Sequence, residues 1–314
     1  MTSLKTELEQ PSFEPGPQTT GDTVTKPSKK KTRAEDQGPR RKRGISGWIV
    51  LGVLFLCALL MLFPFWLALI NGFKPAAEYL DKGPISIPTQ LDFSAIINFW
   101  RGVNFTEKLL NSVVISGSVA LIAAGLSLFS AFAIGIGKVK GRVWIIAVFM
   151  LAFTIPQEAL VYPLFILTRE LGIYDTQIGI ILILSVLQSA FGTYMLSSVL
   201  GAFPVEILEA ARIDGASRWI ILRRIVFPLT RPTLGVLLTF FFIWTWNQLF
   251  LPLVLLPSAA NQTVSVSLGA LSGQYTSSPT ALAAASLAGI LPALIFFILF
   301  QRTLMRGVNL GAVK

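Results

Sequence analysis

Residues 209–216 of the chain read EAARIDGA, and they lie inside a polar segment, residues 203–232, that separates two long apolar runs. Pro204 suits the first position of a helix, because its fixed φ fits there and its missing N–H would have no partner anyway. Apolar residues recur at helical spacing from residue 205 to residue 211, with charged residues pointing elsewhere, which predicts an amphipathic helix of about three turns. Gly215 follows where a helix C-cap needs a left-handed residue.

A second short helix is predicted over residues 217–226, where Trp219, Leu222 and Ile225 share one face. Pro228 is expected to stop this helix, and Pro232 to open the next apolar run. Two small helices that are joined at a glycine and lie along a membrane surface suit contact with a soluble partner. The residues leave a second interpretation open, in which the segment is an interfacial loop that only connects two spans.

The composition indicates a membrane protein, since 53% of the 314 residues are hydrophobic and only 13% are charged. The single cysteine, Cys57, cannot form an intrachain disulfide, and the absence of histidine removes Ser-His-Asp and Cys-His nucleophiles and histidine metal sites. The chain is therefore expected to be a transport protein and not an enzyme, with no catalytic residue and no metal site. It has no Walker P-loop, so any ATP site must lie on another chain.

Six apolar runs predict an all-α polytopic membrane protein, because a hydrocarbon core of about 30 Å needs roughly 20 apolar residues per helix. The predicted spans are residues 47–70, 109–136, 143–167, 178–200, 233–256 and 281–300. Residues 1–46 are polar and rich in lysine, and we expect them to form a disordered basic tail that contacts anionic lipid.

The net charge of +10 lies mostly at the membrane flanks, so no nucleic-acid partner is expected. Most Lys and Arg residues occur in the N-terminal tail and in the connections on its side of the membrane. The positive-inside rule therefore predicts that both termini and residues 203–232 are cytoplasmic.

Residues 203–232 resemble the EAA loop of the membrane subunits of bacterial ABC importers. The residues that carry the resemblance are Glu209, Ala210, Ala211, Asp214, Gly215, Ala216, Ile225, Pro228 and Pro232. The resemblance implies that this loop docks into a cleft on a cytoplasmic ATPase subunit, which would hold ATP and magnesium, and transmits its closure to the membrane helices. The candidate coupling residues are Glu209, Ala210, Ala211, Asp214, Gly215, Ala216 and Arg218.

From about Trp48 to Lys314 the chain is similar to the second permease subunit of maltose-type carbohydrate importers. The matching features are Asn111-Ser112, Ile155-Pro156, Trp246-Asn247 and the ending 301–314, whereas Gln248 stands where many relatives have glutamate. The resemblance implies the type I ABC importer permease fold in a bacterial cytoplasmic membrane. It also implies four partners: a sister permease, two ATPase subunits and an extracellular solute-binding protein.

The same resemblance implies that the outer loop before the last span, residues 257–280, reaches into the sugar cleft of the binding protein. Within this loop, residues 263–268 alternate between polar and apolar side chains, which predicts a strand-like piece.

Polar side chains in three of the predicted spans indicate a pathway for a sugar. Glu158 is the only carboxylate or cationic residue inside the six spans, and such a group is costly in lipid unless it faces a cavity or a partner. At about 1.5 Å per residue, Glu158, Gln188 and Asn247 are expected at one depth. With the adjacent Gln157, Trp246 and Gln248 they are predicted to line the pathway, because amides and aromatic rings suit sugar hydroxyls and ring faces. Interhelical hydrogen bonding that only holds the helices together is the alternative.

The favoured function is a permease subunit of an ATP-driven importer of a carbohydrate, an oligosaccharide such as a di- or trisaccharide. An ion-coupled secondary transporter is an alternative, because it would also be polytopic with polar groups inside the membrane. Against it, six spans without a visible repeat are few for such a carrier, which also has no use for the glycine-centred loop. A further alternative is an ABC permease for a non-sugar solute such as glycerol phosphate.

Overall fold

The computed structural model describes residues 45–137, 139–274 and 278–310, and within these ranges all regular structure is helical. The chain divides into two units, residues 1–55 and residues 56–314. The predicted disordered tail, residues 1–46, lies outside the described residues except for its last two, which begin helix α1 (Ile45–Gly72). Of the first unit, only the start of α1 therefore belongs to the described residues.

Within the described residues, five helices are long and apolar enough to cross a membrane. They are α1, α4 (Phe105–Ile136), α7 (Gln177–Gly201), the continuous helix Arg218–Trp246 that ends with α10 (Phe227–Trp246), and α13 (Pro279–Leu310). A sixth span results if α5 (Arg142–Thr154), η1 (Gln157–Leu160) and α6 (Val161–Glu170) are taken together. The all-α polytopic fold predicted from the sequence is confirmed.

The third predicted span, residues 143–167, is not straight, because the chain bends by 89° between α5 and the η1–α6 segment. Pro156 has no N–H to continue the helix, and it forces Ile155 into extended backbone with ψ of 124°. The bend places Gln157 and Glu158 in a short 3₁₀ turn at the break rather than on a regular helix. The depth estimate for Glu158, which assumed an unbroken helix, was therefore wrong in its premise.

The fifth predicted span, residues 233–256, is broken as well. Helix α10 ends at Trp246, and a separate short helix α11 (Phe250–Leu255) comes after it. Pro252 cannot donate to the Gln248 carbonyl four residues earlier, so the helical ladder cannot run through this point. Asn247 and Gln248 thus lie in a second break.

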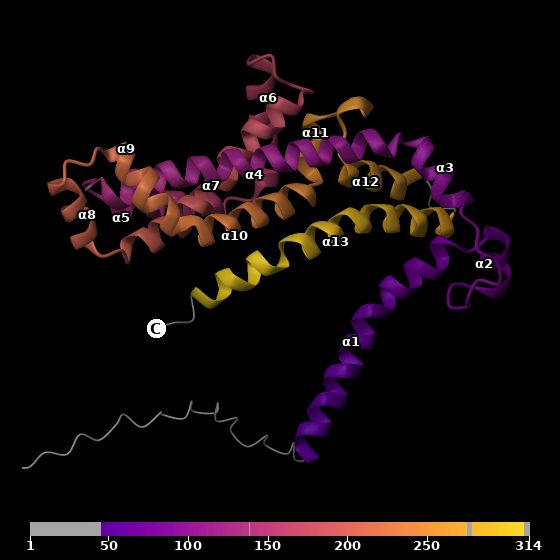
Figure 1. Ribbon diagram of the computed structural model, residues 1–314. Helices are drawn as coiled ribbons and strands as arrows, with labels where there is room; N and C mark the ends of the chain where they lie inside the picture. The colour runs from indigo at the N-terminus through magenta and orange to yellow at the C-terminus, as the bar shows by residue number, and fades with distance from the viewer. Residues whose placement is uncertain (1–44, 138, 275–277, 311–314) are drawn as a thin grey trace, which may run out of the picture. The chain divides into compact units, whose positions relative to one another are not determined.

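Helices α4, α7 and α10 run side by side and form the main buried core, with α5 against α7 and α13 against α10 (Figure 1). Small residues allow the helices to approach closely. Gly192 of α7 shows this, because a Cβ there would lie 2.2 Å from Ser127 Oγ and 2.8 Å from the Phe241 ring. These three helices therefore form the frame on which the bent spans and the polar segment 203–232 are held.

A second buried cluster holds the two short outer helices α6 and α11 against the first halves of α4 and α7. Its buried members are Ile115, Val119, Ile180, Ile183, Leu184, Leu251, Leu255 and Leu256, and Val161, Leu164 and Phe165 of α6 pack on them. The two broken spans are thus joined to each other beyond their breaks.

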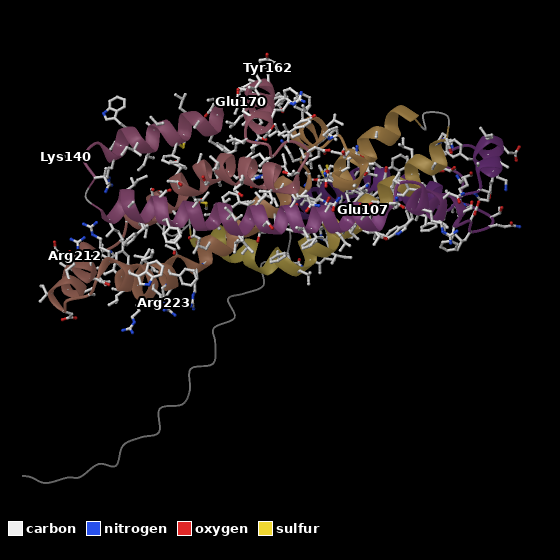
Figure 2. All side chains as sticks on the ribbon, turned by 90° about the horizontal axis from the view of Figure 1, so that it is seen from above. Glu107, Lys140, Tyr162, Glu170, Arg212 and Arg223 are labelled. Carbon is white, nitrogen blue, oxygen red and sulfur yellow. The ribbon has the colours of Figure 1, made fainter. Side chains whose placement is uncertain are left out.

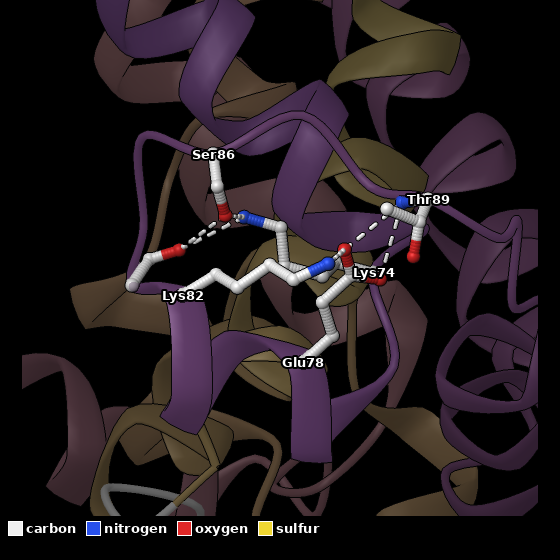
Figure 3. Close-up of polar contacts among 6 residues, drawn as sticks. Lys74, Glu78, Lys82, Ser86 and Thr89 are labelled. Atoms are coloured by element: carbon white, nitrogen blue, oxygen red, sulfur yellow. Dashed lines mark hydrogen bonds and ion pairs between the residues drawn. The ribbon is translucent and has the colours of Figure 1, made fainter.

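The segment between α1 and α3 (Ser94–Gly102) is folded by a polar network around helix α2 (Ala76–Lys82), shown in Figure 3. Lys74 is only 1% exposed, and its Nζ donates to the Gly83 carbonyl at 3.0 Å and to Ser86 Oγ at 3.2 Å. Burial lowers the pKa of the Lys74 ammonium. Glu78 accepts a hydrogen bond from the Thr89 N–H and pairs with Lys82 at 3.2 Å. The segment is therefore ordered and forms no separate domain.

The predicted strand at residues 263–268 is wrong, because helix α12 (Val264–Gln274) occupies this place. Val264 and Val266 are both buried. Ser265, between them, and Ser267, after Val266, donate to backbone carbonyls, Ser265 Oγ to Trp246 at 2.6 Å and Ser267 Oγ to Thr263 at 3.0 Å. Ser265 is half-buried and Ser267 is buried, so the alternation of polar and apolar residues does not mark a solvent-exposed face. The preceding loop is held over the start of α4 by Asn111, whose Nδ2 donates to the Ala260 carbonyl at 2.7 Å.

The loop before α12 is also tied to Asp175 at the start of α7. The Asp175 carboxylate accepts hydrogen bonds from the Ser258 hydroxyl and from the Ser258 N–H at 3.2 Å, and its carbonyl accepts from Asn261 Nδ2 at 2.6 Å. The hydrogen bond from the Ser258 hydroxyl holds the pKa of this carboxyl below its ordinary value of 3.8, although partial burial opposes the shift.

This tether predicts an acid-sensitive contribution to stability. A folded-state pKa below the ordinary 3.8 means that the stabilisation is fully present above that value and is lost as the pH falls through the folded-state pKa. Asp175→Asn should lower the Tm of the purified protein at pH 7, and the difference from wild type should close below pH 3.8. Thermal unfolding between pH 7 and pH 3 measures this, with Asp81→Asn, an exposed acid of α2, as the control. A Tm difference that does not change with pH would contradict the prediction.

Candidate functional site

The segment that contains EAARIDGA begins with helix α8 (Val205–Ile213), which ends in a left-handed turn at Gly215 with φ of 77°. The Ala216 N–H bonds to the Ala211 carbonyl at 2.9 Å, and the Gly215 N–H bonds to the Arg212 carbonyl at 3.0 Å. These two bonds form a Schellman motif, the common helix ending that requires a left-handed residue at the position of Gly215. The C-cap predicted from the sequence is therefore present.

The second short helix does not stop at Pro228 as predicted. Helix α9 (Arg218–Ile221), capped by the Ser217 hydroxyl, runs through a π-helical turn, η2 (Leu222–Val226), directly into α10. In the π turn the Phe227 N–H bonds to the Leu222 carbonyl five residues back, so Pro228 begins a new α-helical turn where its missing N–H costs little. One continuous helix therefore joins residue 218 to residue 246.

The coupling segment, which we define as residues 203–221, has one buried and one exposed side. Leu208 and Ile221 belong to the main core, and Ala211 and Ala216 pack partly against it. The exposed members of the predicted coupling set are Glu209, Ala210, Asp214, Gly215 and Arg218. Arg212 and Arg223 lie at the same end of the helices as Lys140 (Figure 2). The predicted coupling residues thus form a surface whose two half-buried alanines attach it to the core.

Two contacts between the coupling segment and α4 were missed from the sequence. Arg212 Nη2 donates to the Ile136 carbonyl at 3.4 Å, at the C-terminal end of α4 where a cation is favoured. The Trp219 ring, although 60% exposed, stacks on Phe129 with centroids 6.5 Å apart. A pocket of about 420 Å³ lies at the first of these contacts and is lined by both Arg212 and Ile136. Only the position of Arg212 in the last turn of a predicted helix hinted at a role beyond surface charge.

The two breaks in the bent spans meet at a pocket of about 340 Å³, which we call the central pocket. It is lined by Phe153, Gln157, Glu158, Leu187, Gln188, Trp244, Asn247 and Gln248. Five of the six predicted pathway residues therefore lie together, contributed by three separate stretches of the chain. Glu158 and Asn247 are exposed, whereas Gln188 is only 4% exposed.

Hydrogen bonds hold the amides of this pocket. Gln248 Nε2 donates to Gln157 Oε1 at 2.7 Å and thereby joins the two breaks directly. Gln188 Nε2 donates to Thr245 Oγ1 at 2.9 Å, while Gln188 Oε1 is buried without a partner among the described residues. A buried acceptor without a donor is costly, so a ligand hydroxyl at this point would be favoured.

Trp246, the sixth predicted pathway residue, does not line the pocket. It is 5% exposed and packs in the main core between Phe242 and Phe296, with ring centroids 5.8 Å and 5.7 Å away. Trp244 takes its place at the pocket. Residues two positions apart on an α-helix point about 200° away from each other. Trp244 and Trp246 therefore cannot both face the same side of α10.

Apart from Leu187, the groups that line the central pocket are amides, a carboxylate and aromatic rings. In residues 45–137, 139–274 and 278–310 no three His, Cys, Asp or Glu side chains come together as a metal site. The pocket offers one carboxylate, four amides and two aromatic rings, a set suited to a hydroxylated ligand with an apolar ring face.

Comparison with known proteins adds the family. The family model described as "Binding-protein-dependent transport system inner membrane component" matches residues 40–308. The inner membrane ABC transporter permease protein YcjP of Escherichia coli (strain K12) is 32% identical over 263 residues, which cover 83% of this chain and 94% of that protein. The trehalose transport system permease protein SugB of Mycobacterium tuberculosis (strain CDC 1551 / Oshkosh) is 31% identical over 271 residues, or 85% and 97% of the two chains.

A solved structure shares the fold. A chain of a bacterial ABC transporter involved in the import of the acidic polysaccharide alginate superposes with a TM-score of 0.70 at 22% identity, covering 83% of this chain and 97% of that one. The apolar helices, the family match and the permease relatives show an inner-membrane transport subunit rather than an enzyme. The chain belongs to the binding-protein-dependent transport system inner membrane component family, among the permease proteins of ABC transporters.

Proposed function

We propose that this chain is the permease subunit of an ATP-driven importer for a neutral oligosaccharide, a di- or trisaccharide, and that residues 203–221 couple it to ATPase subunits. The observation that carries the proposal is the continuous helix Arg218–Trp246. Its first residues belong to the exposed coupling segment, and Trp244 near its other end lines the central pocket. A displacement of the coupling segment is therefore passed along one continuous helix to the pocket.

Side-chain contacts also hold the coupling segment at the start of this helix. Arg212 and Trp219 attach the coupling segment to the end of α4, which packs along both α7 and α10. When an ATPase cleft grips the exposed residues around Gly215, the pull acts on α4 and α10 together. ATP and Mg²⁺ stay on the partner ATPase, and this chain supplies no reacting group.

The lining of the central pocket supports a neutral sugar. Sugar hydroxyls can bond to the amides of Gln157, Gln188 and Asn247, and an apolar sugar face can stack on Trp244. Among the residues that the structure describes, Glu158 is the only charged one that lines this pocket, and no lysine or arginine does. A carboxylate without a cation repels phosphate, which disfavours the glycerol phosphate alternative.

The proposed assembly contains a sister permease, two ATPase subunits and an extracellular solute-binding protein, with both termini of this chain in the cytoplasm. The positive-inside distribution of Lys and Arg supports this orientation. The trehalose permease relative supports a disaccharide as substrate.

The test is uptake into proteoliposomes that contain the full complex. Radiolabelled trehalose, maltose and lactose are offered with the binding protein outside and ATP inside, with an ionophore to collapse ion gradients, and glycerol 3-phosphate serves as the control solute. We expect accumulation of at least one sugar that requires ATP and survives the ionophore. Uptake that needs an ion gradient and no ATP, or accumulation of glycerol 3-phosphate alone, would overturn the proposal.

A further inference from the structure

A second polar pocket, of about 440 Å³, lies between α5 and α7 at their ends next to the coupling segment. We call it the inner pocket, and its lining is Arg142, Ile146, Tyr194, Ser197, Ser198, Gly201 and Ala202. Both helices that form it also lead to the central pocket, through Phe153 on α5 and Leu187 and Gln188 on α7. Neither the family match nor the predicted pathway residues assign a role to it.

Helical spacing places the two pockets on the same side of this helix pair. On α7, Leu187, Tyr194 and Ser198 follow each other at i, i+7 and i+11, which is one stripe of a helix. On α5, Arg142, Ile146 and Phe153 follow at i, i+4 and i+11 in the same way. Ten residues separate Gln188 from Ser198, so the pockets are about 15 Å apart along α7.

Three aromatic rings form one cluster, which begins at the central pocket and extends toward the inner pocket through Phe191. Phe191 of α7 contacts Phe153 at 5.1 Å and Trp244 at 5.2 Å between ring centroids, and Phe153 and Trp244 are 6.1 Å apart. Phe153 and Trp244 belong to the central pocket, and Phe191 lies on the α7 stripe between Leu187 and Tyr194. A ligand that travels along this face toward the coupling segment must pass these rings.

The chemistry of the inner pocket suits a saccharide. The Arg142 guanidinium offers several donors, and its Nη2 lies 3.7 Å from where a side chain on Gly201 would begin. Tyr194 and Ser198 are exposed beside it and provide a ring face and two hydroxyls. Ser197 is only 5% exposed, and its Oγ has no partner among the described residues. A bound sugar hydroxyl would supply a partner at this lining residue.

We propose that the inner pocket is a second saccharide subsite, which the transported sugar occupies after passing the Phe153, Phe191 and Trp244 rings and before it leaves toward the coupling segment. The proposal rests on the proposed import function. It assigns Arg142, Tyr194 and Ser198 as the sugar contacts of this subsite.

The test uses the single cysteine of the chain, Cys57. In a Cys57→Ser background, Ser198→Cys places one thiol in the inner pocket with little change in size. The full complex is assayed in inside-out vesicles with a membrane-impermeant methanethiosulfonate. The competing ligand is the sugar, of trehalose, maltose and lactose, that the wild-type complex accumulates. Ser130→Cys on α4, half-buried near the same end of the helices but outside the pocket lining, is the matched control.

We expect the thiol at position 198 to react from the inner side and the sugar to slow its modification at least threefold, with no effect of sugar at position 130. In addition, Tyr194→Ala should weaken this protection, and Tyr194→Phe, which keeps the ring, should retain most of it. Retained sugar uptake by the Ser198→Cys protein shows that it is folded.

Three results would overturn the subsite. A thiol that does not react, as in a groove filled by lipid or covered by the sister permease, excludes a water-filled sugar site. Modification that sugar does not slow, in a complex that still accumulates sugar, rejects the subsite and leaves the import function standing. If the wild-type complex accumulates no sugar at all, the proposed function fails and the subsite fails with it.

Discussion

Gly215→Val is expected to reduce sugar uptake to background while the protein remains inserted in the membrane. Gly215 has φ of 77°, and a β-branched residue in this left-handed conformation costs about 1–2 kcal/mol. In the described part of the chain no atom lies within 4 Å of the position that a Cβ would occupy, so the harm to these residues comes from the backbone alone. The Schellman turn between α8 and α9 would be distorted, and a side chain would project from the surface proposed to enter the ATPase cleft.

Gly172→Val is the matched control for this substitution. Gly172 has φ of 68°, and no atom of the described residues lies within 4 Å of its Cβ position. It ends α6 in the same Schellman motif, with bonds from its N–H to the Arg169 carbonyl at 3.1 Å and from the Ile173 N–H to the Thr168 carbonyl at 2.9 Å. The strain is therefore of the same kind, and the location lies outside the coupling segment. Gly172→Val should lower the Tm to a similar extent while uptake and ATPase stimulation persist. Normal uptake by Gly215→Val, or equal loss of uptake in both variants, would show that coupling does not depend on this turn.

Gln188→Leu is expected to lower the kcat/KM for sugar uptake about tenfold, the loss that corresponds to roughly one hydrogen bond in the transport transition state. Gln188 is nearly fully buried and lines the central pocket, and its Oε1 has no hydrogen-bond partner in the residues that the structure describes. Leucine keeps most of the volume and removes both polar atoms. The measurement is initial uptake rate against sugar concentration, together with the Tm of the purified complex.

The control separates sugar binding from interhelical bonding. Thr245→Val removes the same hydrogen bond to Gln188 Nε2 from the other side, but Thr245 does not line the pocket. If Gln188 contacts sugar, both variants should lose similar stability and only Gln188→Leu should lose uptake. Equal losses of uptake in the two variants would mean that the amide only holds α7 to α10.

The sequence determined the class of the molecule and the nature of its polar segment. Long apolar runs that cross a membrane must form helices, because hydrocarbon offers no hydrogen-bond partner for the backbone N–H and C=O groups. The turn at Gly215 was also predictable, since the left-handed conformation that a helix ending needs is local and few residues other than glycine adopt it readily. The exposure of Glu209, Asp214 and Arg218 could also be predicted, because burying an unpaired charged side chain is costly.

Counting residues along straight helices predicted that Glu158, Gln188 and Asn247 lie close together, and they do line one pocket, but the assumption of straight helices was wrong for two of them. Glu158 and Asn247 do not stand at a counted height on unbroken spans but at two breaks, where Pro156 and Pro252 interrupt the helical ladder. Polar residues next to proline in an apolar run signal such a break, and that signal was available from the sequence. The bend of 89° itself was not, because its direction is set by the packing of α6 on α11 and α7.

Tertiary structure alone decided which side chains face the pocket and how the coupling segment is attached. Trp244 and Trp246 are the same residue type and lie two positions apart. Only the way α10 packs on α13 buries Trp246 and leaves Trp244 at the pocket. The contacts of Arg212 with Ile136 and of Trp219 with Phe129 join segments far apart in the chain, which no local pattern records. The π turn that carries α9 into α10 past Pro228 likewise depends on burial of Leu222 and Val226 in the core. Local sequence thus determined where helices and turns form, and long-range packing decided which of their polar groups meet.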